Sequence, residues 1–161
     1  MPNEEQKKKP RVIEKWDDWN CKNAAWIEFP RQDGNVDRFL CKGLLGEDLD
    51  YIERQCTPPT PPKKPRYDEK NKPVIIGGKM QSDPNFEDPE YKKLIVEFAN
   101  KRVVLILERG LVKPDGKEMP GKTWQEKFAY LNKKLRGDVI KLANFINVEL
   151  SNLSQLDVNL F

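Results

Sequence analysis

The chain has 161 residues, of which 37% are hydrophobic and 34% are charged. This length suits one domain with tails, and the polar composition indicates that part of the chain stays outside a core or requires a partner. The 29 basic and 26 acidic residues leave a net charge of +3. Such a balance argues against nucleic-acid binding, which usually needs basic charge concentrated on one face.

Residues 1–11 are charged, contain proline and are poor in apolar side chains, which predicts a flexible basic tail. They lack the apolar centre of a secretory signal. No stretch of the chain approaches the roughly 18 apolar residues of a membrane span. We therefore expect a soluble, intracellular protein that does not bind a membrane.

Residues 12–56 form the first segment that can pack. Two short β-prone runs, at 25–29 and 36–40, flank an Asp-Gly pair, which predicts a β-hairpin. A short helix is expected at 46–55, because acidic residues near its start suit the positive end of the helix dipole.

A proline-rich connector is predicted for residues 57–87. Proline removes backbone donors and favours extended neighbours, so the connector should be a semi-rigid polyproline II spacer as far as residue 73. The alternative is a PxxP ligand for an aromatic groove. Val74, Ile75 and Ile76, followed by two glycines, indicate one short strand.

A long helix is predicted for residues 88–109. Asp88 can cap it, Pro89 suits its first turn, and Gly110 is the expected left-handed terminator. Its second half, residues 103–107, is apolar on every side. Either the C-terminal helices cover that half, or a partner surface does.

Two further helices are expected before residue 150. Thr123 and Glu126 have the spacing of a capping box for the first, and Gly137 and Asp138 should end it and cap the second. The segment 151–161 keeps several apolar residues, so it could dock on the core or on a partner. The fold class is therefore α+β: a hairpin and short helix (12–56), a connector (57–87), a helical domain of about three helices (88–150) and an apolar tail (151–161).

The sequence contains no recognisable catalytic constellation. It has no histidine, which removes His-based acid–base chemistry, and it has no phosphate-binding glycine motif. The cysteines, Cys21, Cys41 and Cys56, make an incomplete zinc set and are expected to be free thiols. We expect neither an enzyme nor a cofactor or metal.

The order of features resembles a known family. Trp26 to Phe29 come first, followed by Gly-Leu-Leu-Gly-Glu-Asp-Leu at 43–49 and the proline connector. Asp-Pro-Asn-Phe-Glu-Asp-Pro-Glu-Tyr at 83–91, Ala-Asn-Lys-Arg-Val at 99–103 and Leu-Glu-Arg-Gly-Leu at 107–111 follow. Over roughly residues 25–150 the chain resembles the tail assembly chaperones of long-tailed bacteriophages.

The resemblance implies a non-enzymatic protein of the host cytoplasm that binds the tape measure and tail-tube subunits during phage assembly. Two alternatives stay open: a virion structural protein, such as a connector, tail or decoration component held by extended arms, and a small enzyme or enzyme inhibitor. Homo-oligomerisation stays open as well. Partner-binding residues are expected on the long helix, the next helix and the tail: Tyr91, Leu94, Phe98, Arg102, Leu105, Trp124, Phe128, Leu160 and Phe161.

Overall fold

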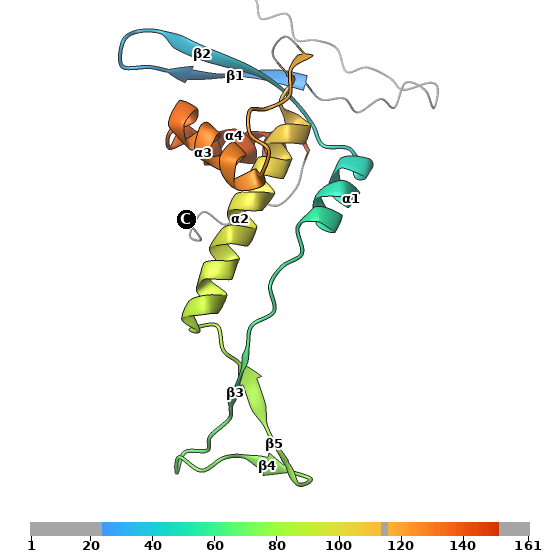
Figure 1. The fold of residues 1–161 in the computed structure, drawn as a ribbon, viewed down its shortest axis with the longest axis vertical. Helices are drawn as coiled ribbons and strands as arrows, with labels where there is room; N and C mark the ends of the chain where they lie inside the picture. The colour runs from blue at the N-terminus through green and yellow to red at the C-terminus, as the bar shows by residue number, and fades with distance from the viewer. Residues whose placement is uncertain (1–23, 114–115, 152–161) are drawn as a thin grey trace, which may run out of the picture.

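The computed structural model describes residues 24–113 and 116–151, so the expectations for the basic tail, for Cys21 and for Leu160 and Phe161 lie outside the described part. Within it, a helical head carries a narrow arm that projects from one side (Figure 1). The elements in chain order are β1 (Ala24–Pro30), β2 (Val36–Lys42), α1 (Gly46–Gln55), β3 (Lys63–Pro65), β4 (Ile75–Ile76), β5 (Lys79–Met80), β6 (Ser82–Pro84), α2 (Pro89–Gly110), α3 (Trp124–Leu135), α4 (Asp138–Asn144) and the π-helix η3 (Phe145–Leu150). The predicted α+β class is confirmed.

Strands β1 and β2 form the predicted antiparallel hairpin, with Ile27 opposite Phe39. Alternate side chains of β1 face inward, as a strand with one buried face requires. On the inner face the rings of Phe29 and Phe39 meet edge to face with centroids 5.8 Å apart. The apolar inner face of the hairpin therefore covers one side of the head.

Helix α2 is the axis of the molecule. Asp88 caps it as expected: its side chain accepts a hydrogen bond from the Tyr91 backbone N–H at 2.9 Å. Helices α1, α3 and α4 and the π-helix η3 all contact α2, and η3 also contacts both strands of the hairpin. One core thus joins segments that are far apart in the sequence.

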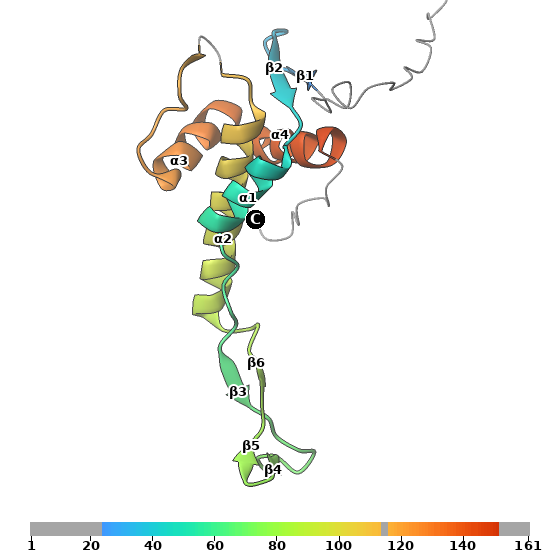
Figure 2. The ribbon, with the colours of Figure 1, turned by 90° about the vertical axis from the view of Figure 1, so that its right-hand side faces the viewer.

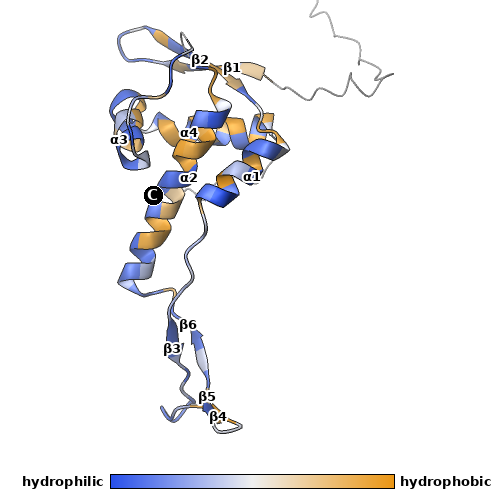
Figure 3. Cartoon of the chain, turned by 45° about the vertical axis from the view of Figure 1, so that its right-hand side comes forward, coloured by the Kyte–Doolittle hydropathy of each residue, from blue (hydrophilic) through white to orange (hydrophobic). Residues whose placement is uncertain are grey.

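The core gathers around the second half of α2. Val103, Val104 and Leu107 are fully buried, and Ile106 is nearly so. They belong to one cluster with residues of the hairpin, α1, α3, α4 and η3. Figure 3 shows the same distribution, with hydrophobic ribbon concentrated in the head part of α2 and in α4. Of the two alternatives for this half of the helix, the structure shows burial inside the chain.

Gly110 corrects one expectation. It is the last residue of α2 and is absent from the glycines with positive φ, so it does not terminate the helix in a left-handed conformation. A Cβ atom built at Gly110 would lie only 2.8 Å from Cδ1 of the buried Ile146. Glycine is present there because η3 approaches the helix backbone closely.

The start of α3 follows the prediction in part, and its end does not. The Thr123 side chain accepts from the Glu126 N–H at 3.3 Å, but Glu126 reaches back to the N–H of Lys122 and not to that of Thr123. At the other end Arg136, and not Gly137, has positive φ (50°). Asp138 is the first residue of α4 and does not cap it.

The connector expectation is wrong from residue 63 onward. Instead of continuing as a polyproline spacer, the chain forms β3, which pairs antiparallel with β6, so that Lys64 faces Asp83. Of the short strand predicted at 74–76, Ile75 and Ile76 form β4, which pairs with β5. Prolines are tolerated because both strands of a two-stranded sheet are edges. Residues 57–87 therefore leave the head, turn and return as an arm, which stays narrow after a quarter-turn of the view (Figure 2).

Candidate functional site

Backbone hydrogen bonds, and not an apolar core, hold the arm together. Near its end the Arg66 N–H donates to the Gln81 carbonyl (2.9 Å), the Gln81 N–H donates to Val74 (2.8 Å), and the Val74 N–H donates back to Arg66 (2.9 Å). All of β3, β4 and β5 is exposed. Hydrogen bonds are directional, so they fix the shape of the arm without burying its side chains.

Two turns complete the end of the arm. In the first, a carboxylate oxygen of Asp68 accepts hydrogen bonds from the N–H groups of Lys70 (2.9 Å) and Lys72 (2.8 Å). In the second, Gly77 and Gly78 both have positive φ (58° and 73°) and join β4 to β5. Two successive left-handed residues are what a tight two-residue hairpin turn demands.

Large hydrophobic side chains stand exposed at this end. Ile75 is 60% exposed, Ile76 64% and Met80 57%, and Tyr67 on the neighbouring segment is 55% exposed. We call these residues the tip patch. Ile75 and Met80 pair across β4 and β5 and lie on one face of the hairpin, whereas Ile76 lies on the other. Isolated exposed hydrophobic residues are ordinary, but a group of them on both faces at the end of a projecting arm is a candidate binding surface.

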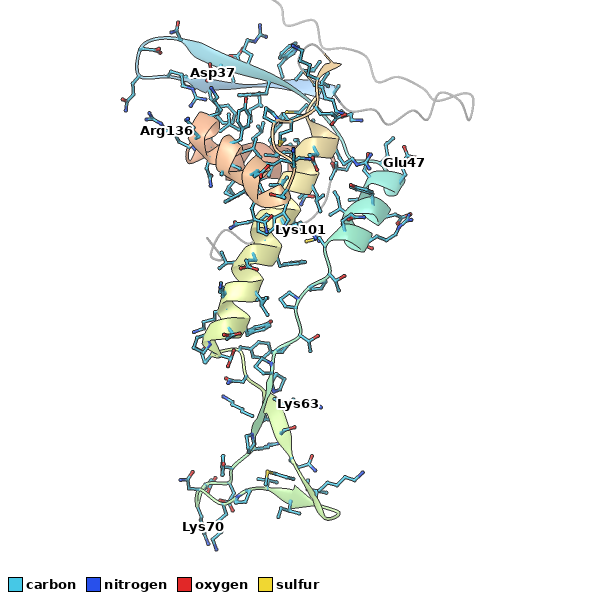
Figure 4. All side chains as sticks on the ribbon, viewed as in Figure 1. Asp37, Glu47, Lys63, Lys70, Lys101 and Arg136 are labelled. Atoms are coloured by element: carbon cyan, nitrogen blue, oxygen red, sulfur yellow. The ribbon has the colours of Figure 1, made fainter. Side chains whose placement is uncertain are left out.

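The arm is predominantly basic. Residues 63–83 carry six basic side chains and three acidic ones. Figure 4 labels Lys63, at the start of β3, and Lys70, in the turn at the far end of the arm. Arg66 and Asp83 are 3.9 Å apart and both half-exposed, so solvent screens their attraction. The surroundings of the tip patch thus favour a partner with acidic side chains.

A second surface lies where the arm joins the head. Leu94, Glu97, Phe98 and Lys101 are spaced three and four apart, so they share one face of α2. With Cys56, Thr57, Pro59 and Trp124 they line a groove of about 260 Å³. We call it the helix groove; Lys101 is labelled beside it in Figure 4.

Contacts of α1 fix the wall of this groove. The Arg109 guanidinium lies 3.9 Å from the ring centroid of Tyr51, and its Nη1 is 3.8 Å from the buried carboxylate of Asp48. At the other end of α1 the Cys56 thiol is 3.4 Å from the Phe98 carbonyl oxygen, to which it donates. Helix α1 is therefore held at both ends, and the point where the chain enters the arm is set.

The structure brings part of the expected partner-binding set together. Leu94, Phe98 and Trp124 line the helix groove. Tyr91 lies one turn before Leu94, where its ring meets that of Phe86 edge to face at 6.0 Å. Arg102 is half-buried.

Two members of that set pack in the core and do not line the groove. Leu105 is 6% exposed and lies in the core, so it is not available to a partner. The expectation that it forms a partner surface came from the all-round apolar character of residues 103–107, which the chain's own elements cover. Phe128 is half-buried and packs against the same core.

The described cysteines are buried free thiols, as expected for Cys41 and Cys56. Burial raises the pKa of Cys41 to about 11. Burial also raises the pKa of Cys56, although Lys101 and Arg102 oppose the shift. Both thiols stay protonated at neutral pH and are poor nucleophiles. Residues 24–113 and 116–151 contain no group of His, Cys, Asp or Glu side chains arranged to hold a metal ion.

The tip patch is not among the surfaces that the sequence predicts. Residues 74–76 predict one short strand before two glycines, and this prediction does not include Lys79 and Met80 as its partner. A signal was present, because Gly-Gly between short β-prone runs is a hairpin pattern. The arm itself gives no local signal, since β3 and β6 pair across the whole intervening segment.

None of the helices in the described part of the chain has the length and apolar content that crossing a membrane requires. Comparison of the chain with protein-family models, curated proteins and solved structures gives no significant match.

Proposed function

We propose that the protein assists bacteriophage tail assembly without catalysing a reaction, by holding the tape measure and tail-tube subunits through its arm. The observation that carries the proposal is the contrast between a filled head core and the exposed tip patch. The sequence resemblance supplies the class of partner. Assembly would take place in the host cytoplasm.

The size of the tip patch suits reversible binding. Burial of an aliphatic side chain contributes about 1.5–3 kcal/mol. Association costs at least about 4 kcal/mol in lost translational and rotational freedom. Ile75, Ile76 and Met80 together therefore support a weak contact rather than a permanent one. An assembly chaperone needs such a contact, because it must release its client.

The charge of the arm supports a client with acidic side chains beside its apolar ones. Residues 63–83 have twice as many basic as acidic side chains, and they are largely exposed. Such attraction raises the association rate and weakens with salt. Binding should therefore weaken as the salt concentration rises from about 0.05 to 0.5 M, over which the screening length shortens severalfold.

The projecting arm also favours one alternative, a virion structural protein whose arm is held by neighbouring subunits. The copy number in purified particles separates the two functions. A chaperone should be absent from mature particles, whereas a structural component should be present at a fixed number of copies.

The experiment compares two single substitutions in the tagged full chain, produced during phage infection. Ile76→Asp places a charge in the tip patch, and Val36→Asp places one on the exposed end of the hairpin, where Val36 is 50% exposed. Proteins that co-purify with each variant are identified and quantified by mass spectrometry.

We expect the unaltered chain and Val36→Asp to retain the tape measure and tail-tube proteins, and Ile76→Asp to lose at least about 90% of them, as loss of one buried anchor predicts. Equal recovery with all three chains would contradict a role of the arm. Recovery of other proteins only would contradict the proposed client.

A further inference from the structure

The helix groove leaves apolar side chains of the head uncovered. Leu94 is 49% exposed although it lies on the same face of α2 as Phe98, and Trp124 at the start of α3 is only partly buried. Pro59 on the opposite wall is also partly buried. Residues 24–113 and 116–151 do not fill this space.

We propose that the groove binds the segment 152–161 of the same chain. This segment carries Leu153, Leu156, Val158, Leu160 and Phe161, so half of its residues are apolar. Its single charged residue is Asp157. The inference does not depend on the proposed function, because the tip patch lies at the far end of the arm.

The last described residue fixes where the segment starts. The hydroxyl of Ser151 accepts a hydrogen bond from the Leu44 N–H at 2.8 Å and donates one to the Ile146 carbonyl at 2.6 Å. Leu44 lies just before α1, and Cys56, which lines the groove, directly follows α1. The segment therefore leaves the head at one end of α1, and the groove lies at the other.

The segment is long enough to reach the groove. The ten residues of α1 cover about 15 Å at 1.5 Å per residue. Along α2, the twelve positions from Gly110, which Ile146 approaches closely, back to Phe98 cover about 18 Å. Ten extended residues span up to about 33–36 Å. After crossing this distance, residues 157–161 still remain to lie in the groove.

The groove also complements the charge of the segment. Lys101 lines it and lies beside the point where the chain leaves α1 (Figure 4). An ion pair between Lys101 and Asp157 would orient the segment. Val158, Leu160 and Phe161 would supply apolar contact. Because the segment is tethered, its effective concentration at the groove is on the order of millimolar. The docked state is therefore populated even if the contact itself is weak.

A disulfide trap in the full chain tests the proposal. Cys21→Ser is combined with Leu160→Cys and Glu97→Cys, since Glu97 is an exposed residue of the groove wall. The matched control replaces Glu97→Cys with Lys92→Cys. Lys92 is also exposed on α2, about 140° around the helix from Glu97 at 100° per residue. Oxidation rates are followed on non-reducing gels, and the linked peptides are identified by mass spectrometry.

We expect an intramolecular bond in the Glu97→Cys chain to form at least about tenfold faster than in the control, because docking raises the local concentration of the thiol. Adding Val158→Ser and Phe161→Ser should slow it to the control rate without unfolding the head. Equal rates in both pairs, or no effect of the serine substitutions, would overturn docking. A disulfide-linked dimer in the Glu97→Cys chain would overturn it in favour of a second copy in the groove.

Discussion

The head and the arm are held together by different forces. In the head, apolar side chains from the hairpin, α1, α2, α3, α4 and η3 share one core. In the arm, backbone hydrogen bonds set the shape and the large apolar side chains face solvent. Helix α2 links the two, because its second half is buried in the core and its first half leads to the arm. The residues that form the core and the exposed apolar side chains of the arm therefore lie in separate parts of the chain.

Among the substitutions that compare the head with the arm, Leu105→Asp should have the largest effect on the free energy of unfolding. Leu105 is 6% exposed in the head core, so the substitution places an unpaired charge among apolar side chains. Such a change costs more than about 4 kcal/mol, enough to unfold a typical small domain. Circular dichroism and urea unfolding measure it. A folded, soluble Leu105→Asp chain would show that this face of α2 is not part of the core.

Alkaline pH should weaken the head through Cys41. Its pKa is raised to about 11 from a usual 9.0, so the protonated thiol stabilises the folded state. This stability is complete below pH 9 and is lost as the pH rises to about 11. A shift of this size corresponds to about 2–3 kcal/mol.

The measurement is urea unfolding from pH 7 to 11 of the unaltered chain and of Cys41→Ala. The variant should lose about 2–3 kcal/mol less than the unaltered chain between pH 9 and 11, because tyrosine and lysine ionisation is common to both. Parallel curves for the two chains would mean that Cys41 is not held in a dry core.

Gly110→Ala should destabilise the head although alanine favours helices. The added methyl would overlap the side chain of the fully buried Ile146, and overpacking of this kind costs about 1–3 kcal/mol. Gly46→Ala is the matched control, since nothing lies within 4 Å of a Cβ there and its φ is ordinary. The control should be neutral or up to about 1 kcal/mol more stable. Equal thermal midpoints for both variants would contradict close packing of η3 against α2.

Ile76→Asp should have the smallest effect on stability. Ile76 is 64% exposed at the tip of the arm, so its charge stays in water. The free energy of unfolding should change by less than about 0.5 kcal/mol, as for other exposed positions. Urea unfolding followed by Trp fluorescence measures it. A loss of more than 1 kcal/mol would show that the arm contributes to the core after all.

Local signals made most of the head predictable. The Asp-Gly pair predicted the hairpin, and Asp88 with Pro89 predicted the start of α2 to the residue. Features that depend on neighbours distant in sequence were not predictable. The role of Gly110 depends on Ile146, and the pairing of β3 with β6 depends on the path of the whole arm.

The residues of the candidate site also divide into those that the sequence predicts and those that depend on packing. The groove residues Leu94 and Phe98 could be selected from the sequence because an amphipathic stripe marks one face of a helix. Leu105 continued that apolar pattern, and only the packing of other elements shows that it is covered. The exposure of Ile75 and Ile76 could not be predicted either, because an apolar pair has the same sequence pattern whether it faces a core or solvent.

Hydrogen exchange of the full chain, measured with and without its co-purified partner, tests the separation of head and arm most directly. Without partner, the amides of residues 66–81 should exchange quickly and those of residues 103–107 only on global unfolding. With partner, we predict that the largest gain in protection falls on residues 66–81. A gain confined to the head, with the arm unchanged, would contradict the central claim that the arm is the surface this chain offers to others.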